Sequence, residues 1–288
     1  MSLALEAARS LLFVPGNRPE RLEKAARSGA DCVIVDLEDS VPAGEKAAAR
    51  HAIAAAWQGL GAFRIPVIVR VNAEDTEDSH EDLRMVRALA GLQGVMVPKA
   101  ESCDSLRRVG AALPGVRILP IVETAAGYTR VESIAATPGV VRLAVGHIDF
   151  MADTGITCGR DEAELDPLRF AVAVATRNAR LAPAVDGVTV QTDDEQRLRE
   201  DALRAKRFGS GGKLCIHPRQ VAFVNEVFTP TSAEIAWARR VVEADAGSGG
   251  SAVRLDGRMV DKPVVLQAQR LLARAALYEA SVSRRSPS

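Results

Sequence analysis

Residues 117–149 read RILPIVETAAGYTRVESIAATPGVVRLAVGHID, and they contain two apolar runs, Arg117–Val122 and Val141–Gly146. Near-continuous apolar runs of this length are typical of strands that are buried on both faces of a parallel sheet. Glu123 directly follows the first run, and Asp149 lies just after the second. A carboxylate is costly to bury unless it is paired or binds a metal. This stretch therefore indicates both a parallel sheet and the position of a site.

The same pattern extends in both directions along the chain. Six further apolar runs are Ser10–Val14, Cys32–Leu37, Pro66–Val71, Gly94–Pro98, Ala182–Val188 and Lys213–Ile216. Amphipathic stretches typical of helices lie between the runs, such as Glu20–Arg27, Gly44–Trp57, Glu81–Ala90, Cys103–Leu113, Pro167–Arg180 and Asp193–Phe208. Eight strands alternating with helices predict an α/β protein with a (β/α)₈ TIM barrel. A doubly wound open sheet is the alternative.

Composition excludes several classes of function. Lys plus Arg equals Asp plus Glu, at 37 each, so the chain lacks the basic excess of a nucleic-acid binder. No apolar run approaches the roughly 20 residues of a membrane helix, and residues 1–9 contain no apolar signal core. The four cysteines are scattered without a C-x-x-C pair, which favours buried, reduced thiols in a cytoplasmic protein.

In a (β/α)₈ barrel the reactive side chains lie at the carboxyl ends of the strands. Glu123 and Asp149, from adjacent strands, are candidates to bind one cation. Two carboxylates that leave the remaining positions to water and substrate are typical of Mg²⁺, with Mn²⁺ as an alternative. Capping of the following helix is the competing structural role for both residues.

Two basic strand-end residues are candidates for binding an anionic substrate. Arg70 can hold a carboxylate or an enolate oxygen, or it can form a salt bridge with Asp36, Glu38 or Asp39. Lys99 is a candidate substrate-binding residue. A Schiff base at Lys99 is a rival mechanism, but nearby carboxylates oppose the low pKa that it needs.

A third basic group follows the first predicted strand. Arg18 and Lys24 are candidates for binding phosphates near the barrel mouth. A solvated basic helix face is the alternative for these residues.

Together these segments resemble the citrate-lyase-beta-like family within the HpcH/HpaI aldolase and malyl-CoA lyase superfamily. The matching motifs, in order, are RSLLFVPGNRPERLEKA, DCVIVDLEDSV, VIVRVN, VMVPKAES, ILPIVETAAG, GHIDFMADTG, KLCIHPRQV and DGRMVDKPVV. They span nearly the whole chain.

The resemblance implies roles for individual residues. Glu123 and Asp149 would ligate Mg²⁺, and Arg70 would contact the carboxylate or oxo group of the substrate. The remaining implied site residues are Asp36, Glu38 and Asp39, which would line or support the site, and Phe13, Pro15, Arg18 and Lys24, which would help to hold CoA. Asp261, in MVDKPVV, would act as general acid or base from a C-terminal lid that reaches a neighbouring subunit.

The resemblance also implies the domain organisation and the assembly. A catalytic barrel would occupy residues 1–230, and a helical extension, residues 231–288, would pack on a neighbouring subunit. The protein would form a homotrimer, or a hexamer built as a dimer of trimers. Its partners would be small molecules, either a 2-oxo acid or a CoA thioester.

The expected reaction is Mg²⁺-dependent Claisen-type cleavage or condensation of a short 3-hydroxy-dicarboxylyl-CoA, such as malyl-CoA or citramalyl-CoA, giving acetyl-CoA and a 2-oxo acid. A malyl-CoA or citramalyl-CoA thioesterase and the beta subunit of a citrate lyase complex are the rivals. A non-catalytic scaffold protein is a third alternative, which the cluster of charged residues disfavours.

His147 departs from the family pattern, in which a small, apolar or acidic residue is more common. It would contact the substrate, or it would serve only in packing or in a backbone hydrogen bond.

Overall fold

The protein is described by a computed structural model that covers residues 5–60, 63, 65–248 and 252–282. It forms two compact units, Met1–Phe228 and Thr229–Ser288. Among the described residues no helix combines the length and the apolarity needed to cross a bilayer.

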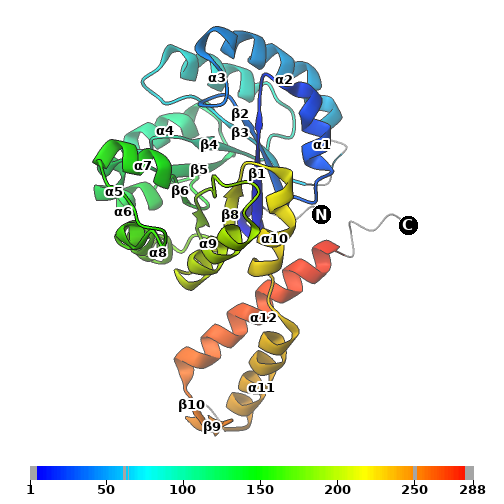
Figure 1. Cartoon of the computed structure of the whole chain (residues 1–288), viewed down its shortest axis with the longest axis vertical. Coiled ribbons are helices and arrows are strands. Elements are labelled where there is room, and N and C mark those ends of the chain that lie inside the picture. Colours follow the sequence, from blue (N-terminus) through cyan, green and yellow to red (C-terminus); the bar gives the residue numbers. More distant parts are fainter. Residues whose placement is uncertain (1–4, 61–62, 64, 249–251, 283–288) are drawn as a thin grey trace. The chain divides into compact units, whose positions relative to one another are not determined.

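The first unit is a closed barrel of eight parallel strands in sequence order, with helices around it (Figure 1), so the predicted (β/α)₈ barrel is confirmed. The strands are β1 (Ser10–Pro15), β2 (Cys32–Asp36), β3 (Val67–Arg70), β4 (Gly94–Val97), β5 (Arg117–Val122), β6 (Ala144–Val145), β7 (Val185–Asp186) and β8 (Gly212–Cys215). The α-helices are α1 (Leu22–Ala26), α2 (Lys46–Leu60), α3 (Glu77–Arg87), α4 (Cys103–Ala112), α5 (Ala125–Thr129), α6 (Val131–Ala135), α7 (His147–Thr154), α8 (Asp166–Asn178), α9 (Glu195–Arg207) and α10 (Pro218–Phe228). β8 pairs with β1 and closes the sheet.

Alternating strand residues build two apolar layers. One set fills the barrel interior and includes Leu11, Ile34, Ile68, Met96 and Leu119. The neighbouring positions on the same strands pack outward against the helices, which explains why the strands are apolar on both faces.

Strands β6 and β7 are shorter than predicted. Only Ala144–Val145 and Val185–Asp186 lie in the ladder, instead of Val141–Gly146 and Ala182–Val188. The start of each run still bonds to its neighbour, because the Val141 amide donates to the Ile118 carbonyl and the Ala182 amide donates to the Val141 carbonyl. Pro183 has no N–H group with which to continue a regular ladder.

The second unit is a helical hairpin. Helices α11 (Ser232–Ser248) and α12 (Lys262–Val282) are joined through the antiparallel strands β9 (Val253–Leu255) and β10 (Arg258–Val260). The turn between the strands is Asp256–Gly257, and both residues have positive φ, as a tight two-residue hairpin requires. A small apolar core holds this unit together and includes Ala238, Val241, Val260, Val265 and Ala268.

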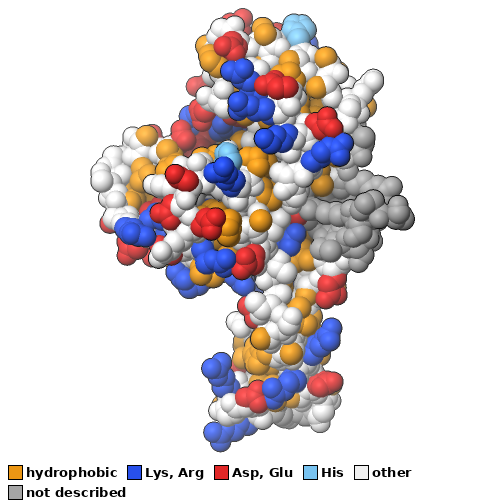
Figure 2. Space-filling view, turned by 45° about the vertical axis from the view of Figure 1, so that its right-hand side comes forward, with side chains coloured by type: hydrophobic (Ala, Val, Ile, Leu, Met, Phe, Trp, Pro, Cys, Tyr) orange, Lys and Arg blue, Asp and Glu red, His pale blue; other side chains and the backbone are white. Residues whose placement is uncertain are grey.

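All four cysteines are free. Cys32 and Cys215 are buried as expected, whereas Cys103 and Cys158 are partly exposed. Figure 2 shows acidic and basic side chains interspersed over the face of the barrel unit that it draws.

Candidate active site

Parallel strands all present their carboxyl ends at one mouth of the barrel. Asp36 ends β2, Arg70 ends β3, and Glu123 directly follows β5. Lys99 comes two residues after β4, and Asp149 lies in the first turn of α7.

Arg70 is the centre of a cluster of charged residues. Its guanidinium makes two hydrogen bonds to Asp36, of 2.6 and 2.7 Å, and also contacts Glu38 at 2.7 Å and Asp39 at 3.2 Å. It lies over the Phe13 ring, 4.8 Å from the centroid. The salt bridges that the sequence offered as an alternative role are therefore all present. Of the three acidic side chains, Asp39 is the most exposed, at 55%.

The pKa values in this cluster follow from its geometry. Burial alone would raise the pKa of Asp36, but the hydrogen bonds and charge of Arg70 outweigh it and hold this pKa below its usual range. The backbone amides of Glu38 and Ser40 add two hydrogen bonds to the Asp36 carboxylate. Asp36 is thus a permanent anion that fixes the orientation of Arg70.

Glu123 is buried, with 3% of its surface exposed. Its Oε1 atom accepts a 2.7 Å hydrogen bond from the Lys99 amide. Burial raises its pKa to about 8; the charges of Asp149 and Glu38 also raise it, while the Lys99 amide and Arg70 lower it. A Cβ atom at position 146 would overlap Glu123 Oε2, so a glycine is required there for this carboxylate to take its place.

Neither Glu123 nor Asp149 caps a helix. Thr124 is the cap of α5 and accepts a hydrogen bond from the Gly127 amide. The N-cap residue of α7 is Gly146, which has no side chain to cap the helix. Within the described ranges the Asp149 carboxylate has no hydrogen bond or ion pair. The described residues contain no group of three or more His, Cys, Asp or Glu side chains suited to a metal, so any cation here would rely on two carboxylates.

Lys99 bridges two parts of the mouth. Its ammonium group donates a 2.5 Å hydrogen bond to Glu38. Burial lowers the pKa of Lys99, but the hydrogen bond to Glu38 and the charges of Glu38, Asp39 and Glu123 outweigh it and raise this pKa. A raised pKa disfavours the Schiff-base mechanism, which requires a neutral amine.

His147 is buried, and its ring lies directly against Gly187. Burial lowers the pKa of His147 to about 4, and the charge of Lys213 contributes to this shift. The imidazole is therefore neutral at pH 7. Its Nδ1 atom has no hydrogen-bond partner in the described part of the chain.

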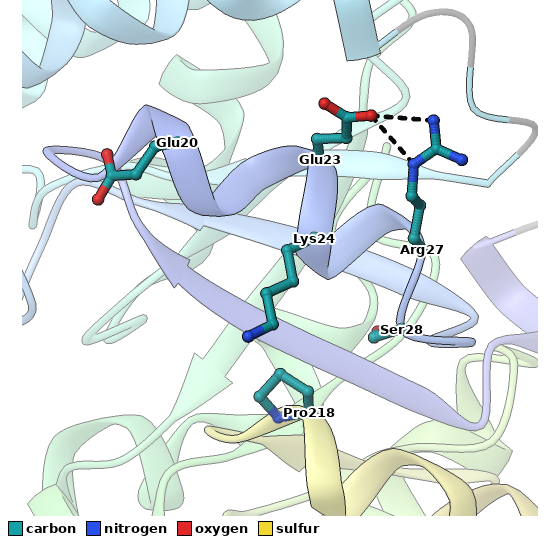
Figure 3. Close-up of a pocket in the computed structure, with 6 residues that line it drawn as sticks. All are labelled: Glu20, Glu23, Lys24, Arg27, Ser28 and Pro218. Atoms are coloured by element: carbon teal, nitrogen blue, oxygen red, sulfur yellow. Dashed lines mark hydrogen bonds and ion pairs between the residues drawn. The ribbon is translucent and has the colours of Figure 1, made fainter.

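The candidate CoA-binding residues lie along β1 and α1. Phe13 and Pro15 belong to β1, Arg18 precedes the short helix Pro19–Arg21, and Lys24 lies in α1. A pocket of about 510 Å³ opens beside α1 (Figure 3) and is lined by Glu20, Glu23, Lys24, Arg27, Ser28 and Pro218. In Figure 3 Arg27 is paired with Glu23, while the Lys24 ammonium points toward Pro218 at the start of α10. Arg18 is exposed and does not line this pocket.

Asp261 lies in the second unit, between β10 and α12. It is exposed, and its carboxylate accepts a long hydrogen bond of 3.4 Å from the Val264 amide in the first turn of α12.

Two features of the mouth were missed by the sequence reasoning. The Lys99 amide is a partner of Glu123, and Gly146 leaves room for its carboxylate. A glycine directly before His147 and Asp149 was the available signal for the second feature. The first depends on backbone conformation and leaves no mark in the residue types.

The fold and the charged mouth define a (β/α)₈-barrel enzyme. The family model described as HpcH/HpaI aldolase/citrate lyase matches residues 9–218. This chain belongs to that family, which confirms the sequence-based assignment to an enzyme of the lyase class.

Relatives of known name cover nearly the whole chain. A citrate lyase subunit beta-like protein of Deinococcus radiodurans is 38% identical over 93% of this chain and 97% of its own length. A (3S)-malyl-CoA thioesterase of Cereibacter sphaeroides is 34% identical over 93% of this chain and 94% of its own length. Among solved structures, CitE from Mycobacterium tuberculosis in complex with magnesium, acetoacetate and coenzyme A matches with a TM-score of 0.82 and 34% identity, covering 94% of this chain and all of that one.

Proposed function

We propose that this protein is a Mg²⁺-dependent carbon–carbon lyase that acts on a short 3-hydroxy-dicarboxylyl-CoA, such as malyl-CoA or citramalyl-CoA. Cleavage gives acetyl-CoA and a 2-oxo acid, and condensation is the reverse reaction. The observation that carries this proposal is the buried Glu123 carboxylate near Asp149, with its Oε2 atom free of hydrogen bonds within the described residues. Burial raises the pKa of Glu123 to about 8, so that it is protonated near neutral pH. A bound cation would stabilise the ionised form.

The residues present fit Mg²⁺. Glu123 and Asp149 would hold the ion through carboxylate oxygens, and Mg²⁺ commonly takes one or two carboxylates and leaves its other positions to water and substrate. When bound, the ion would supply Lewis acidity at the oxygen of the 2-oxo acid. The CitE structure in complex with magnesium supports this choice of ion.

Arg70 would stabilise negative charge on the substrate. Its guanidinium is held in one orientation by Asp36, and a fixed donor costs little reorganisation when charge develops on a carboxylate or an enolate oxygen. The weaker contact with Asp39 is the one that a substrate anion would replace.

Asp261 would exchange a proton with the carbon next to the thioester. In the cleavage direction the hydroxyl proton would pass to water, and the bond between this carbon and the carbinol carbon would break with its electron pair moving to the thioester enolate. The enolate carbon would then take up a proton from Asp261. Following the family resemblance, Asp261 would act from a neighbouring copy in a homotrimer or in a hexamer of two trimers.

The pocket beside Lys24 supports a CoA thioester as the substrate. Its lining contains the acidic residues Glu20 and Glu23 and the basic residues Lys24 and Arg27. Because Arg27 is paired with Glu23, the Lys24 ammonium is the group that would bind phosphate oxygens. The CitE structure contains coenzyme A.

Replacing Lys24 by alanine should raise the KM for the CoA thioester roughly three- to fivefold, the size of an exposed charge contact. The effect should shrink as salt is added, because the contact is solvent-exposed. Arg27→Ala is the matched control, since Arg27 lines the same pocket but is already paired with Glu23. Equal KM values for Lys24→Ala and the wild type would remove Lys24 from the CoA site.

Thioester hydrolysis is the second candidate, because the Cereibacter sphaeroides relative is a (3S)-malyl-CoA thioesterase. Incubation with malyl-CoA and with citramalyl-CoA, with and without Mg²⁺, followed by mass spectrometry, separates the two. A lyase releases acetyl-CoA and glyoxylate or pyruvate, whereas a thioesterase releases free malate or citramalate and CoA. Free hydroxy acid as the sole product would contradict the lyase proposal. A requirement for an acyl-carrier protein would favour a citrate lyase beta subunit.

A further inference from the structure

Lys99 adopts a backbone conformation that is rare for a lysine. Its φ angle is 46°, in the left-handed region that favours glycine. The turn follows β4 directly and faces the end of β5, where the Ala100 amide donates a 3.2 Å hydrogen bond to the Ile121 carbonyl. Unusual backbone conformations persist only where the surrounding structure fixes them, and they are concentrated at functional sites.

The left-handed turn aims the Lys99 amide at Glu123. The amide donates its 2.7 Å hydrogen bond to Oε1, whereas Oε2 lies on the side of Gly146, at the start of the helix that carries Asp149. One oxygen of the carboxylate is thus occupied by the protein, and the other faces the element with the second acidic group. The Lys99 amide therefore restrains the Glu123 carboxylate before any cation arrives.

The Lys99 side chain makes a second connection. Its ammonium bonds Glu38 Oε1, and Glu38 Oε2 contacts Arg70. Lys99 therefore contacts Glu123 through its backbone amide and Glu38, a partner of Arg70, through its side chain.

We propose that Lys99 is a positioning residue, whose left-handed backbone orients Glu123 to bind a divalent cation through Oε2. This inference rests on the proposed function, because it takes Glu123 to be a metal ligand. Groups that hold metal ligands in place commonly contribute about 10- to 100-fold to metal affinity. The ammonium group has a separate role, because it holds Glu38 and not Glu123.

The test compares substitutions that remove the same ammonium but differ in backbone preference. Lys99→Gly and Lys99→Asn tolerate the left-handed region, whereas Lys99→Val is strongly disfavoured there. Isothermal titration with Mg²⁺ alone should give dissociation constants within about threefold of each other for the first two variants. Lys99→Val should bind Mg²⁺ at least about tenfold more weakly than Lys99→Gly.

Stability is controlled in two ways. Thermal unfolding without Mg²⁺ identifies a temperature at which every variant is folded, and Lys99→Ala replaces Lys99→Val if the valine variant does not fold. Arg180 offers a matched backbone control, because it has a φ of 57° and follows α8, at the end of the barrel opposite the mouth. Arg180→Val should be less stable than Arg180→Gly, with the same Mg²⁺ affinity.

The outcomes separate this inference from the proposed function. Wild-type protein that fails to bind Mg²⁺ overturns the proposed function. Wild-type protein that binds Mg²⁺, together with a Lys99→Val variant that binds as tightly as Lys99→Gly, overturns only the role of Lys99.

Discussion

Replacing Glu123 by glutamine should abolish measurable Mg²⁺ binding and lower kcat/KM for carbon–carbon cleavage by roughly 10³-fold or more, because a Lewis-acid metal contributes several kcal/mol to the transition state. Glutamine has the size of glutamate, and its carbonyl can still accept the hydrogen bond from the Lys99 amide. The loss of Mg²⁺ binding and activity would therefore result from the missing negative charge and not from a change in side-chain size. Glu132→Gln, on the exposed face of α6, is the matched control.

In the absence of Mg²⁺, Glu123→Gln should be more stable than the wild type above neutral pH, although it has lost activity. The pKa of Glu123 is about 8 in the folded protein, against 4.5 for a free glutamate. Between these values the folded state holds a proton that the unfolded state has lost, so the contribution of Glu123 to stability falls as pH rises. Glu123→Gln should therefore have a higher Tm than the wild type at pH 8.5, with a smaller difference near pH 5.

Titration calorimetry adds a third measurement. At pH 7 Mg²⁺ binding to the wild type should release a proton, because a ligand carboxylate must be ionised. Measurements in two buffers of different ionisation enthalpy reveal this release. Unchanged Mg²⁺ affinity in Glu123→Gln would remove Glu123 from the metal site.

Replacing Asp261 by alanine should lower kcat by about 10²- to 10⁴-fold, the range of a general acid or base, and leave Mg²⁺ affinity unchanged. Alanine also removes the hydrogen bond to the Val264 amide at the start of α12, so Asp261→Asn is the necessary companion. Asparagine caps helices well but cannot exchange the proton. Both variants should show this loss in kcat, and the asparagine variant should unfold at the wild-type temperature. An asparagine variant within a few-fold of wild-type turnover would show that Asp261 serves only as a cap.

Mixing two inactive variants tests whether Asp261 serves a neighbouring copy. Glu123→Gln chains supply an intact Asp261, and Asp261→Ala chains supply an intact Glu123. If the site is shared between copies, co-refolded mixtures should recover about a quarter of the wild-type activity, because random assembly pairs the intact halves in that fraction of sites. No recovery would mean that each chain supplies its own Asp261.

Regular parts of the fold could be predicted from the sequence because burial on both faces gives long apolar runs. β5 was predicted over the same residues that the structure shows, Arg117–Val122. Helix α3 begins at Glu77 and not at Glu81, because Thr76 caps it by accepting a hydrogen bond from Ser79. A polar first turn carries no apolar periodicity, so the pattern alone placed the start one turn late.

The candidate site, like the fold, could be predicted only in part. Charged residues at strand ends could be identified because parallel strands bring them to one mouth, as Arg70 and Glu123 illustrate. The salt bridges of Arg70 with Glu38 and Asp39 could be established only from distances. The turn at Lys99 could not be predicted, since its conformation depends on contacts with β5 and Glu123 and not on the residue type.

The contact between Arg70 and Asp39 has a consequence for ligand exchange. The free enzyme already holds a carboxylate where the anion of a substrate would dock, and this carboxylate belongs to an exposed side chain with the longest of the Arg70 salt bridges. Asp36 and Glu38 would stay paired with the guanidinium throughout. A substrate that displaced Asp39 would therefore exchange one anion for another and leave the net charge around Arg70 the same. On departure of the product, Asp39 would return to the vacated place.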